Sequence, residues 1–144
     1  MCRMVVALLA MFLVPSGAAS SKIWLASQLN ADPSFFDGRD VIVKGYAIFG
    51  THSHYLLESK AMAIQDHENL ERGIPSTPES EKECLTLINQ GILSTKGRNY
   101  ERLAHHTLVL RGKFFAHYGD KVVDLGSCSN ASGFTIKQLI RATK

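Results

Sequence analysis

Long hydrophobic runs are scarce in this chain of 144 residues. The run at residues 4–14 has 11 positions, well short of the roughly 20 apolar residues that a helix needs to cross a bilayer. The chain also lacks a phosphate-binding loop, a dinucleotide fingerprint and a zinc-protease helix. We therefore expect no transmembrane segment after leader removal, no cofactor and none of the enzyme classes that those motifs define.

An excess of charge is also lacking. The chain has 16 basic and 13 acidic side chains, with a formal net charge of +3. Loss of an N-terminal leader would remove only Arg3 and leave a net charge of +2. This balance is too weak to indicate a polyanionic partner, so we expect no nucleic acid.

The first 19 residues have the three-part order of a secretory signal peptide. Arg3 gives an early positive charge, and the apolar run follows. Pro15 and Gly17 then end this run, and the small residues Ala18 and Ala19 come after them. We therefore predict a cleaved signal peptide at residues 1–19 and an exported protein, periplasmic or secreted. The remaining residues 20–144 are enough for one ordinary domain.

Cysteine is also rare, with three in the chain. Cys2 would leave with the leader, so Cys84 and Cys128 would meet in an oxidising compartment. A disulfide between them is the default expectation. The alternative is two separate buried thiols that pack as small hydrophobic groups.

Strand patterns outnumber helical ones. β-Branched and aromatic residues are concentrated at residues 40–49, 107–115 and 134–140, and shorter strands are predicted at 55–59 and 121–125. Gly45 and Gly112 each interrupt a strand, which is typical of a bulge, a bend or a close backbone approach. Short helical segments are predicted at 21–29 and 100–104.

Two segments are harder to assign. Residues 60–82 are polar and contain Gly73, Pro75 and Pro78, so we predict a long loop that is partly disordered or functional. Residues 84–88 alternate as in a buried strand, which we favour. A helix is the alternative, because Ser76 and Glu79 form a capping-box pattern and Gly91 could end such a helix.

The first long strand has the pattern G-x-x-V-x-V-x-G at Gly38, Val41, Val43 and Gly45, and Leu108, Leu110, Gly112 and Phe114 repeat its spacing later. This arrangement resembles small OB-fold-like domains, and most of all uncharacterised exported bacterial proteins. The resemblance implies a five-stranded Greek-key β-barrel with a helix between the third and fourth strands. It also implies parallel third and fifth strands, which would bring Cys84 and Cys128 to the same end.

Barrels of this type often bind ligands on one sheet face, with basic residues and aromatic rings. The candidate ligand-binding residues are Lys44, Tyr46, Tyr55, Arg111, Lys113 and Phe115. The same aromatic residues could instead pack in the core.

Two histidines form the candidate metal site. His52 and His54 would face the same side of an extended strand and could share an ion, with His67, His105, His106 or His117 as a third ligand. Six scattered histidines match no zinc spacing, so surface histidines are the simpler interpretation. No catalytic residue is predicted, because no nucleophile lies in a recognisable motif.

These observations favour an exported, non-enzymatic binding or interaction module for a protein, peptide or glycan, of undefined oligomeric state. The alternatives are a small metal-dependent hydrolase using His52 and His54, or a structural accessory domain of the cell envelope.

Overall fold

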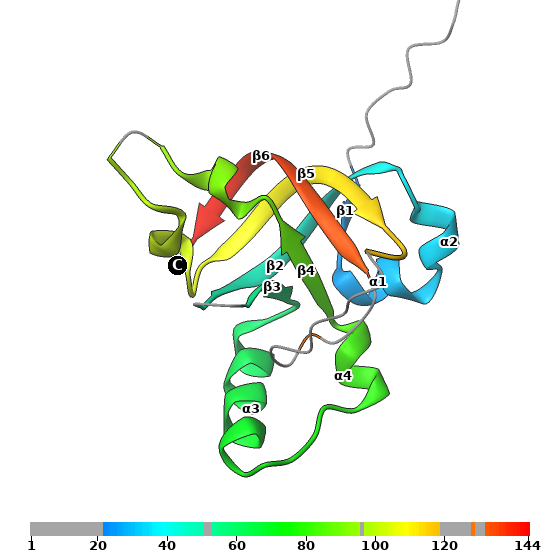
Figure 1. Cartoon of the computed structure of the whole chain (residues 1–144), viewed down its shortest axis with the longest axis vertical. Coiled ribbons are helices and arrows are strands. Elements are labelled where there is room, and N and C mark those ends of the chain that lie inside the picture. Colours follow the sequence, from blue (N-terminus) through cyan, green and yellow to red (C-terminus); the bar gives the residue numbers. More distant parts are fainter. Residues whose placement is uncertain (1–21, 51–52, 96, 119–127, 129–131) are drawn as a thin grey trace, which may run out of the picture.

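Five strands form a closed ring in the computed structural model, which describes residues 22–50, 53–95, 97–118, 128 and 132–144 (Figure 1). They are β2 (Asp40–Phe49), β3 (His54–Leu57), β4 (Cys84–Ile88), β5 (Thr107–Phe115) and β6 (Gly133–Thr143). β2 pairs with β3, β3 with β4, β4 with β6, β6 with β5, and β5 with β2. Within the ring, β4 and β6 run parallel and the other pairs run antiparallel. The mainly β prediction is confirmed, and the ring has the parallel third and fifth strands expected of an OB-fold-like barrel.

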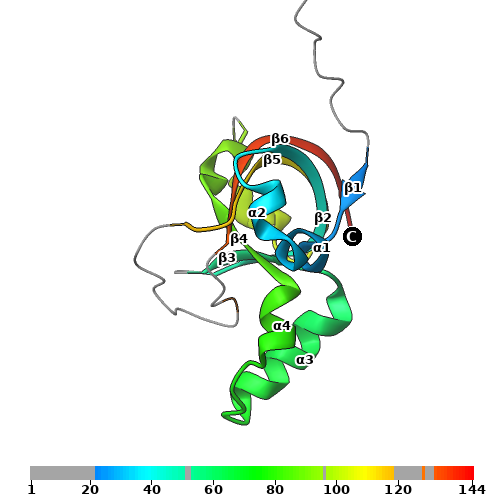
Figure 2. The ribbon, with the colours of Figure 1, turned by 90° about the vertical axis from the view of Figure 1, so that its right-hand side faces the viewer.

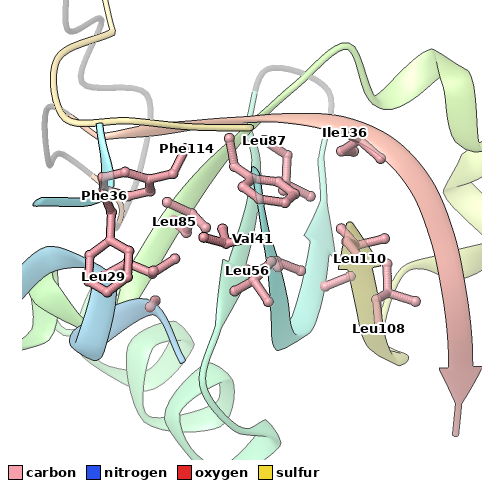
Figure 3. Close-up of a cluster of buried hydrophobic side chains, with 14 of the residues drawn as sticks. Leu29, Phe36, Val41, Leu56, Leu85, Leu87, Leu108, Leu110, Phe114 and Ile136 are labelled. Carbon is pink, nitrogen blue, oxygen red and sulfur yellow. The ribbon is translucent and has the colours of Figure 1, made fainter. Parts of the chain in front are cut away.

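The barrel interior follows from the alternation of side chains along each strand. On β2, Val41 and Val43 belong to the core cluster, whereas Lys44 is exposed. Figure 3 shows Leu56, Leu110 and other core side chains packed together between the strands. Burial of one such leucine contributes roughly 1.5–3 kcal/mol, so this core supplies much of the stability of the fold.

Both interrupting glycines lie where the backbone is crowded, as their position in the pattern predicted. A Cβ on Gly45 would lie 2.8 Å from the Cβ of Leu56. A Cβ on Gly112 would collide with the carbonyl oxygen of Thr135 and lie 2.7 Å from the ring of Phe134. The β5–β6 register shifts between Arg111 and Gly112, so Gly112 also adjoins a bulge. These close approaches let the sheet curl into a barrel.

The N-terminal segment closes one end of the barrel (Figure 2). A helix was predicted at 21–29, but a short strand, β1 (Ile23–Trp24), first pairs parallel to β2, and α1 (Ala26–Ala31) follows it. The short helix α2 (Pro33–Phe36) begins at Asp32, whose side chain accepts a hydrogen bond from the backbone of Phe35. Leu29 and Phe36 belong to the core cluster, so both helices pack on the barrel.

Asn30 of α1 connects distant parts of the chain. Its Nδ2 donates to the carbonyl oxygens of Lys82 at 2.8 Å and Cys84 at 2.9 Å. Its Oδ1 accepts a hydrogen bond of 2.7 Å from the hydroxyl of Ser132, which is buried. One amide therefore joins α1 to the segments that enter β4 and β6.

The predicted long loop at residues 60–82 is wrong, because most of this segment is helical. It contains α3 (Lys60–Glu71) and α4 (Pro78–Lys82), which project from one side of the barrel (Figure 1). α3 begins where the hydroxyl of Ser59 accepts from the backbone of Met62. No residue of α3 is buried, so the helix has no apolar stripe for the sequence pattern to reveal.

The preferred strand at residues 84–88 is confirmed as β4. The competing capping box of Ser76 and Glu79 is not formed. The helix α4 begins after Thr77, whose capping partner is Ser80, and it ends just before β4. Cys84 and Cys128 form the predicted disulfide, with their Cα atoms 5.6 Å apart. Cys84 begins β4 beside the start of its parallel neighbour β6, which explains why the two cysteines meet.

Two 3₁₀ helices, η1 (Gln90–Leu93) and η2 (Tyr100–Leu103), lie between the third and fourth strands of the ring. The helical turn predicted at 100–104 therefore exists, in 3₁₀ form. The predicted leader at 1–19 and the strand at 121–125 lie outside the described residues. In the part of the chain that the structure describes, no helix is both long and apolar enough to span a membrane.

Candidate functional site

The outer surface of β2, β5 and β6 brings together three exposed cations from distant parts of the sequence. Lys44 lies opposite Val109, and Val109 lies opposite Arg141 on its other side. Arg111 follows two positions after Val109 and therefore shares its side of the sheet. Because neighbouring strands are about 4.8 Å apart, the backbones at Lys44 and Arg141 are separated by only about 10 Å. We call Lys44, Arg111 and Arg141 the basic face.

No acidic side chain forms a salt bridge with Lys44, Arg111 or Arg141 among the described residues. The nearby carboxylate of Asp40, which lies on the same side of β2 two residues before Ile42, bonds instead to Lys137. Glu71 contacts His67 on α3, away from this sheet. In the strand register, the neighbours of Arg111 are Ile42 and Gln138, which carry no charge. The three cations therefore give this part of the sheet a local positive potential.

Apolar side chains form the floor between these cations. Ile42 and Val109 point outward from the barrel, yet they are only 7% and 4% exposed. Tyr46, one of the predicted ligand-binding residues, is also 7% exposed, and its ring lies 6.1 Å from that of His105. Tyr46 is therefore part of the floor and presents no ring face for stacking against a ligand.

Lys113 and Phe115 lie further along β5, beyond the basic face. Lys113 is opposite Asp40, whose carboxylate accepts hydrogen bonds of 2.7 and 2.8 Å from Lys137 Nζ. Phe115 is half-buried at the end of the strand, opposite Gly133. These two predicted residues share the strand with Arg111 but lie in a region where charge is partly balanced.

Tyr55 lies on a different surface, the outer side of β3. It is 8% exposed and clusters with Leu57 and Cys84, and Met62 of α3 and Cys128 pack against this cluster. Its hydroxyl lies 3.4 Å from Oδ2 of Asp66. The sheet face that OB-type barrels commonly use for ligands is thus covered here by α3 and by the disulfide.

The candidate metal site is not assembled among the described residues. His52 lies outside them, and no group of three histidine, cysteine or acidic side chains is placed to hold an ion. His54 instead packs between Phe49 and Tyr100, with ring centroids 6.0 and 5.6 Å away. Its Nδ1 is buried and has no hydrogen-bond partner in the described part of the chain.

The environment of His54 disfavours its protonated form. Desolvation by burial lowers its pKa below the usual value of 6.5, and the negative charge of Glu101 opposes that effect. The remaining candidate ligands are dispersed, since His67 is exposed on α3 and pairs with Glu71 at 3.3 Å. His54 therefore packs with the aromatic rings of Phe49 and Tyr100 and is not grouped with the other histidines.

Arg141 is the member of the basic face that sequence reasoning missed. Its strand does not alternate regularly, because Lys137 and Ile140 have no opposite residue in the β5–β6 register. Each extra residue reverses the side that later residues face. The sequence did show a basic residue at the end of a long C-terminal strand. The alternation pattern alone, however, could not predict which side of the sheet this residue faces.

Comparisons with known proteins add a structural similarity. No protein-family model matches the chain. No curated protein matches it in sequence. A solved structure, of a DUF3299 family protein from Pseudomonas aeruginosa PAO1, is similar over 90% of this chain and 89% of that one, with 11% sequence identity and a TM-score of 0.34. At this level the likeness carries no argument about function.

Proposed function

We propose that this chain is an exported, non-enzymatic binding module that holds an acidic segment of a protein or peptide on its basic face. The observation that carries the proposal is the cluster of Lys44, Arg111 and Arg141, which are exposed around an apolar floor and form no salt bridge with an acidic side chain among the described residues. Arginine side chains bind carboxylates through paired, charge-assisted hydrogen bonds. Their placement on paired strands fixes the relative positions of their backbones.

The burial of the aromatic residues favours an acidic peptide over a glycan. Sugar and base recognition in such barrels uses exposed rings, whereas Tyr46 and Tyr55 are both buried. A peptide with spaced carboxylates needs only the cations and the apolar floor. We therefore assign the ligand to an acidic peptide segment.

The proposed export is supported by the disulfide, because such bonds persist in oxidising compartments. It is tested by the intact mass of the protein recovered from the exported fraction. Cleavage after residue 19 and loss of two hydrogens for the bridge are expected. A full-length mass with free thiols would contradict the proposal.

Binding is tested with the chain from residue 20 onward and a fluorescent oligoglutamate peptide as the probe. Replacing Lys44, Arg111 and Arg141 together by Gln should weaken binding about tenfold or more. Replacing the exposed cations Lys60, Arg72 and Lys82 by Gln changes the net charge equally but lies on the helical projection. This control should change affinity less than about threefold.

The outcomes separate the ligand classes. Equal losses in the two triple variants would show only unspecific attraction by net charge and overturn the proposed face. Binding of a sulfated oligosaccharide with no binding of oligoglutamate would move the ligand to an anionic glycan. Stoichiometric metal in the purified chain would support the hydrolase alternative.

A further inference from the structure

An exposed apolar surface of the described chain lies away from the basic face, between α3 and α4. A groove with a cavity volume of about 540 Å³ separates the two helices and the turn that joins them. Its apolar lining includes Met62, Leu70 and Ile74, and its acidic lining consists of Asp66, Glu79 and Glu83. Figure 2 shows both helices on the same side of the barrel. We call this feature the α3–α4 groove.

The apolar residues of the groove are poorly covered. Leu70 is 65% exposed and Ile74 is 48% exposed, and α3 has no fully buried residue along its 12 positions. Only the first part of the helix packs on the barrel, where Met62 and Ala63 meet the cluster around Tyr55. Isolated helices of this length are marginally stable in water, and most helices gain stability from packing. The far end of α3 therefore offers a surface on which further packing would stabilise it.

The charges of the groove define what could cover it. Three carboxylates line the α3–α4 groove, whereas no Lys, Arg or His side chain is among its lining residues. This contrasts with the net positive charge of the whole chain. A partner that buries Leu70 and Ile74 must also approach Glu79 and Glu83, so it needs cationic groups beside its apolar ones.

Two other occupants fit the groove less well. No three acidic, histidine or cysteine side chains of the described residues converge to hold a metal ion, so the carboxylates act as separate charges. In a second copy of the chain, the basic face is a cationic surface among the described residues. The apolar residues of that face, Ile42 and Val109, are buried and cannot reach into a groove.

We infer that the α3–α4 groove is a docking site for a cationic amphipathic peptide segment of a partner protein. The apolar side of the segment would cover Leu70 and Ile74, and its Lys or Arg side chains would face Asp66, Glu79 and Glu83. This mode matches the general way in which amphipathic segments bind apolar grooves. The site is independent of the basic face and attracts ligands of the opposite charge.

The experiment uses the chain from residue 20 onward and a fluorescent peptide made of three repeats of Leu-Lys-Lys-Leu. Binding is followed by fluorescence anisotropy, and a matching Leu-Glu-Glu-Leu peptide tests the sign of the charge. We expect saturable binding of the cationic peptide alone. Replacing Leu70 by Ser should weaken it about tenfold. Replacing Ile64 by Ser should change it less than about threefold, because Ile64 is 52% exposed on the same helix but does not line the groove.

A second pair of variants tests the charges with a matched control. Glu79→Gln with Glu83→Gln removes two groove carboxylates, whereas Glu68→Gln with Glu71→Gln removes two carboxylates of α3 outside the lining. Only the first pair should weaken binding, by about tenfold. Circular dichroism must show unchanged folding in each variant.

Three results would overturn the inference. One is the absence of saturable binding to the unmodified chain, and another is equal loss in the groove and control variants. The third is a dimer of the unmodified chain that the Leu70 variant abolishes in sedimentation experiments, since the groove would then be filled by a second copy.

Discussion

Asn89 and Ile136 are joined by two hydrogen bonds that extend the sheet beyond the end of β4. Nδ2 of Asn89 donates to the carbonyl oxygen of Ile136 at 3.0 Å, and the backbone nitrogen of Ile136 donates to Oδ1 of Asn89 at 2.8 Å. The side-chain amide thus satisfies a backbone unit of β6 where the parallel pairing with β4 has ended at Thr135. Asn89 has a φ of 56°, a left-handed conformation that asparagine tolerates better than most residues.

Removing the Asn89 side chain should destabilise the barrel. Glycine accepts the left-handed backbone, so Asn89→Gly isolates the loss of the two hydrogen bonds. We expect the free energy of unfolding in urea to fall by about 1–3 kcal/mol. Asn89→Ala should be worse by about 1 kcal/mol because of backbone strain, and unchanged stability of the glycine variant would contradict this role.

Adding one methyl group at Gly112 should strongly destabilise the fold. The new Cβ would meet the carbonyl oxygen of Thr135 and the ring of Phe134 inside the barrel. We expect Gly112→Ala to lose about 3 kcal/mol of stability or to fail to fold. The control is Gly91→Ala, because nothing lies within 4 Å of its added Cβ, and thermal melting compares the two proteins. Similar melting of both variants would refute the close approach.

The Cys84–Cys128 bridge should contribute substantially to stability. It spans a sequence separation of 44, for which loop-closure entropy gives at most about 4 kcal/mol. Reduction of the unmodified chain and the double change Cys84→Ala with Cys128→Ala should therefore lower the urea midpoint to a similar extent. If the urea midpoint were the same with and without reductant, the bridge would not constrain the unfolded chain.

His54 should make stability depend on pH. Burial lowers its pKa in the folded state below 6.5, so the unfolded state binds the proton more tightly. The contribution of neutral His54 to the free energy of unfolding is fully present above pH 6.5. It is lost as the pH falls from 6.5 through the lower pKa of His54 in the folded state.

This pH dependence is measured by urea unfolding at a series of pH values. His54→Phe keeps a ring beside Phe49 and Tyr100 and should remove the loss of stability at low pH that comes from His54. The control His67→Gln changes an exposed histidine and should show the same loss as the unmodified chain. A wild-type chain that gains stability on acidification through this range would show the opposite sign.

The sequence pattern was informative where packing is regular. Val41 and Val43 alternate with outward residues on a strand, and Gly45 and Gly112 mark the crowded points that let the sheet curl. Cys84 and Cys128 were paired correctly, because two cysteines remain after the predicted leader and the barrel topology brings them together.

The pattern was less informative where contacts cross the sequence. α3 has no buried face, so its only clear sign was the N-cap at Ser59. Tyr46 and Tyr55 point outward by parity yet are buried. Arg141 joins Lys44 only after two irregularities in β6, which no count along one strand anticipates.

The hydrogen bond between Ser132 and Asn30 joins residues 102 positions apart, and this has a consequence for the timing of folding. A chain is synthesised from its N-terminus, so α1 and β2 emerge long before the partners that complete their interactions. The ring cannot close until β6 is available to bridge β4 and β5. Folds dominated by such non-local pairing form slowly compared with helical ones. The 11 residues of β6 therefore determine when the whole barrel can form.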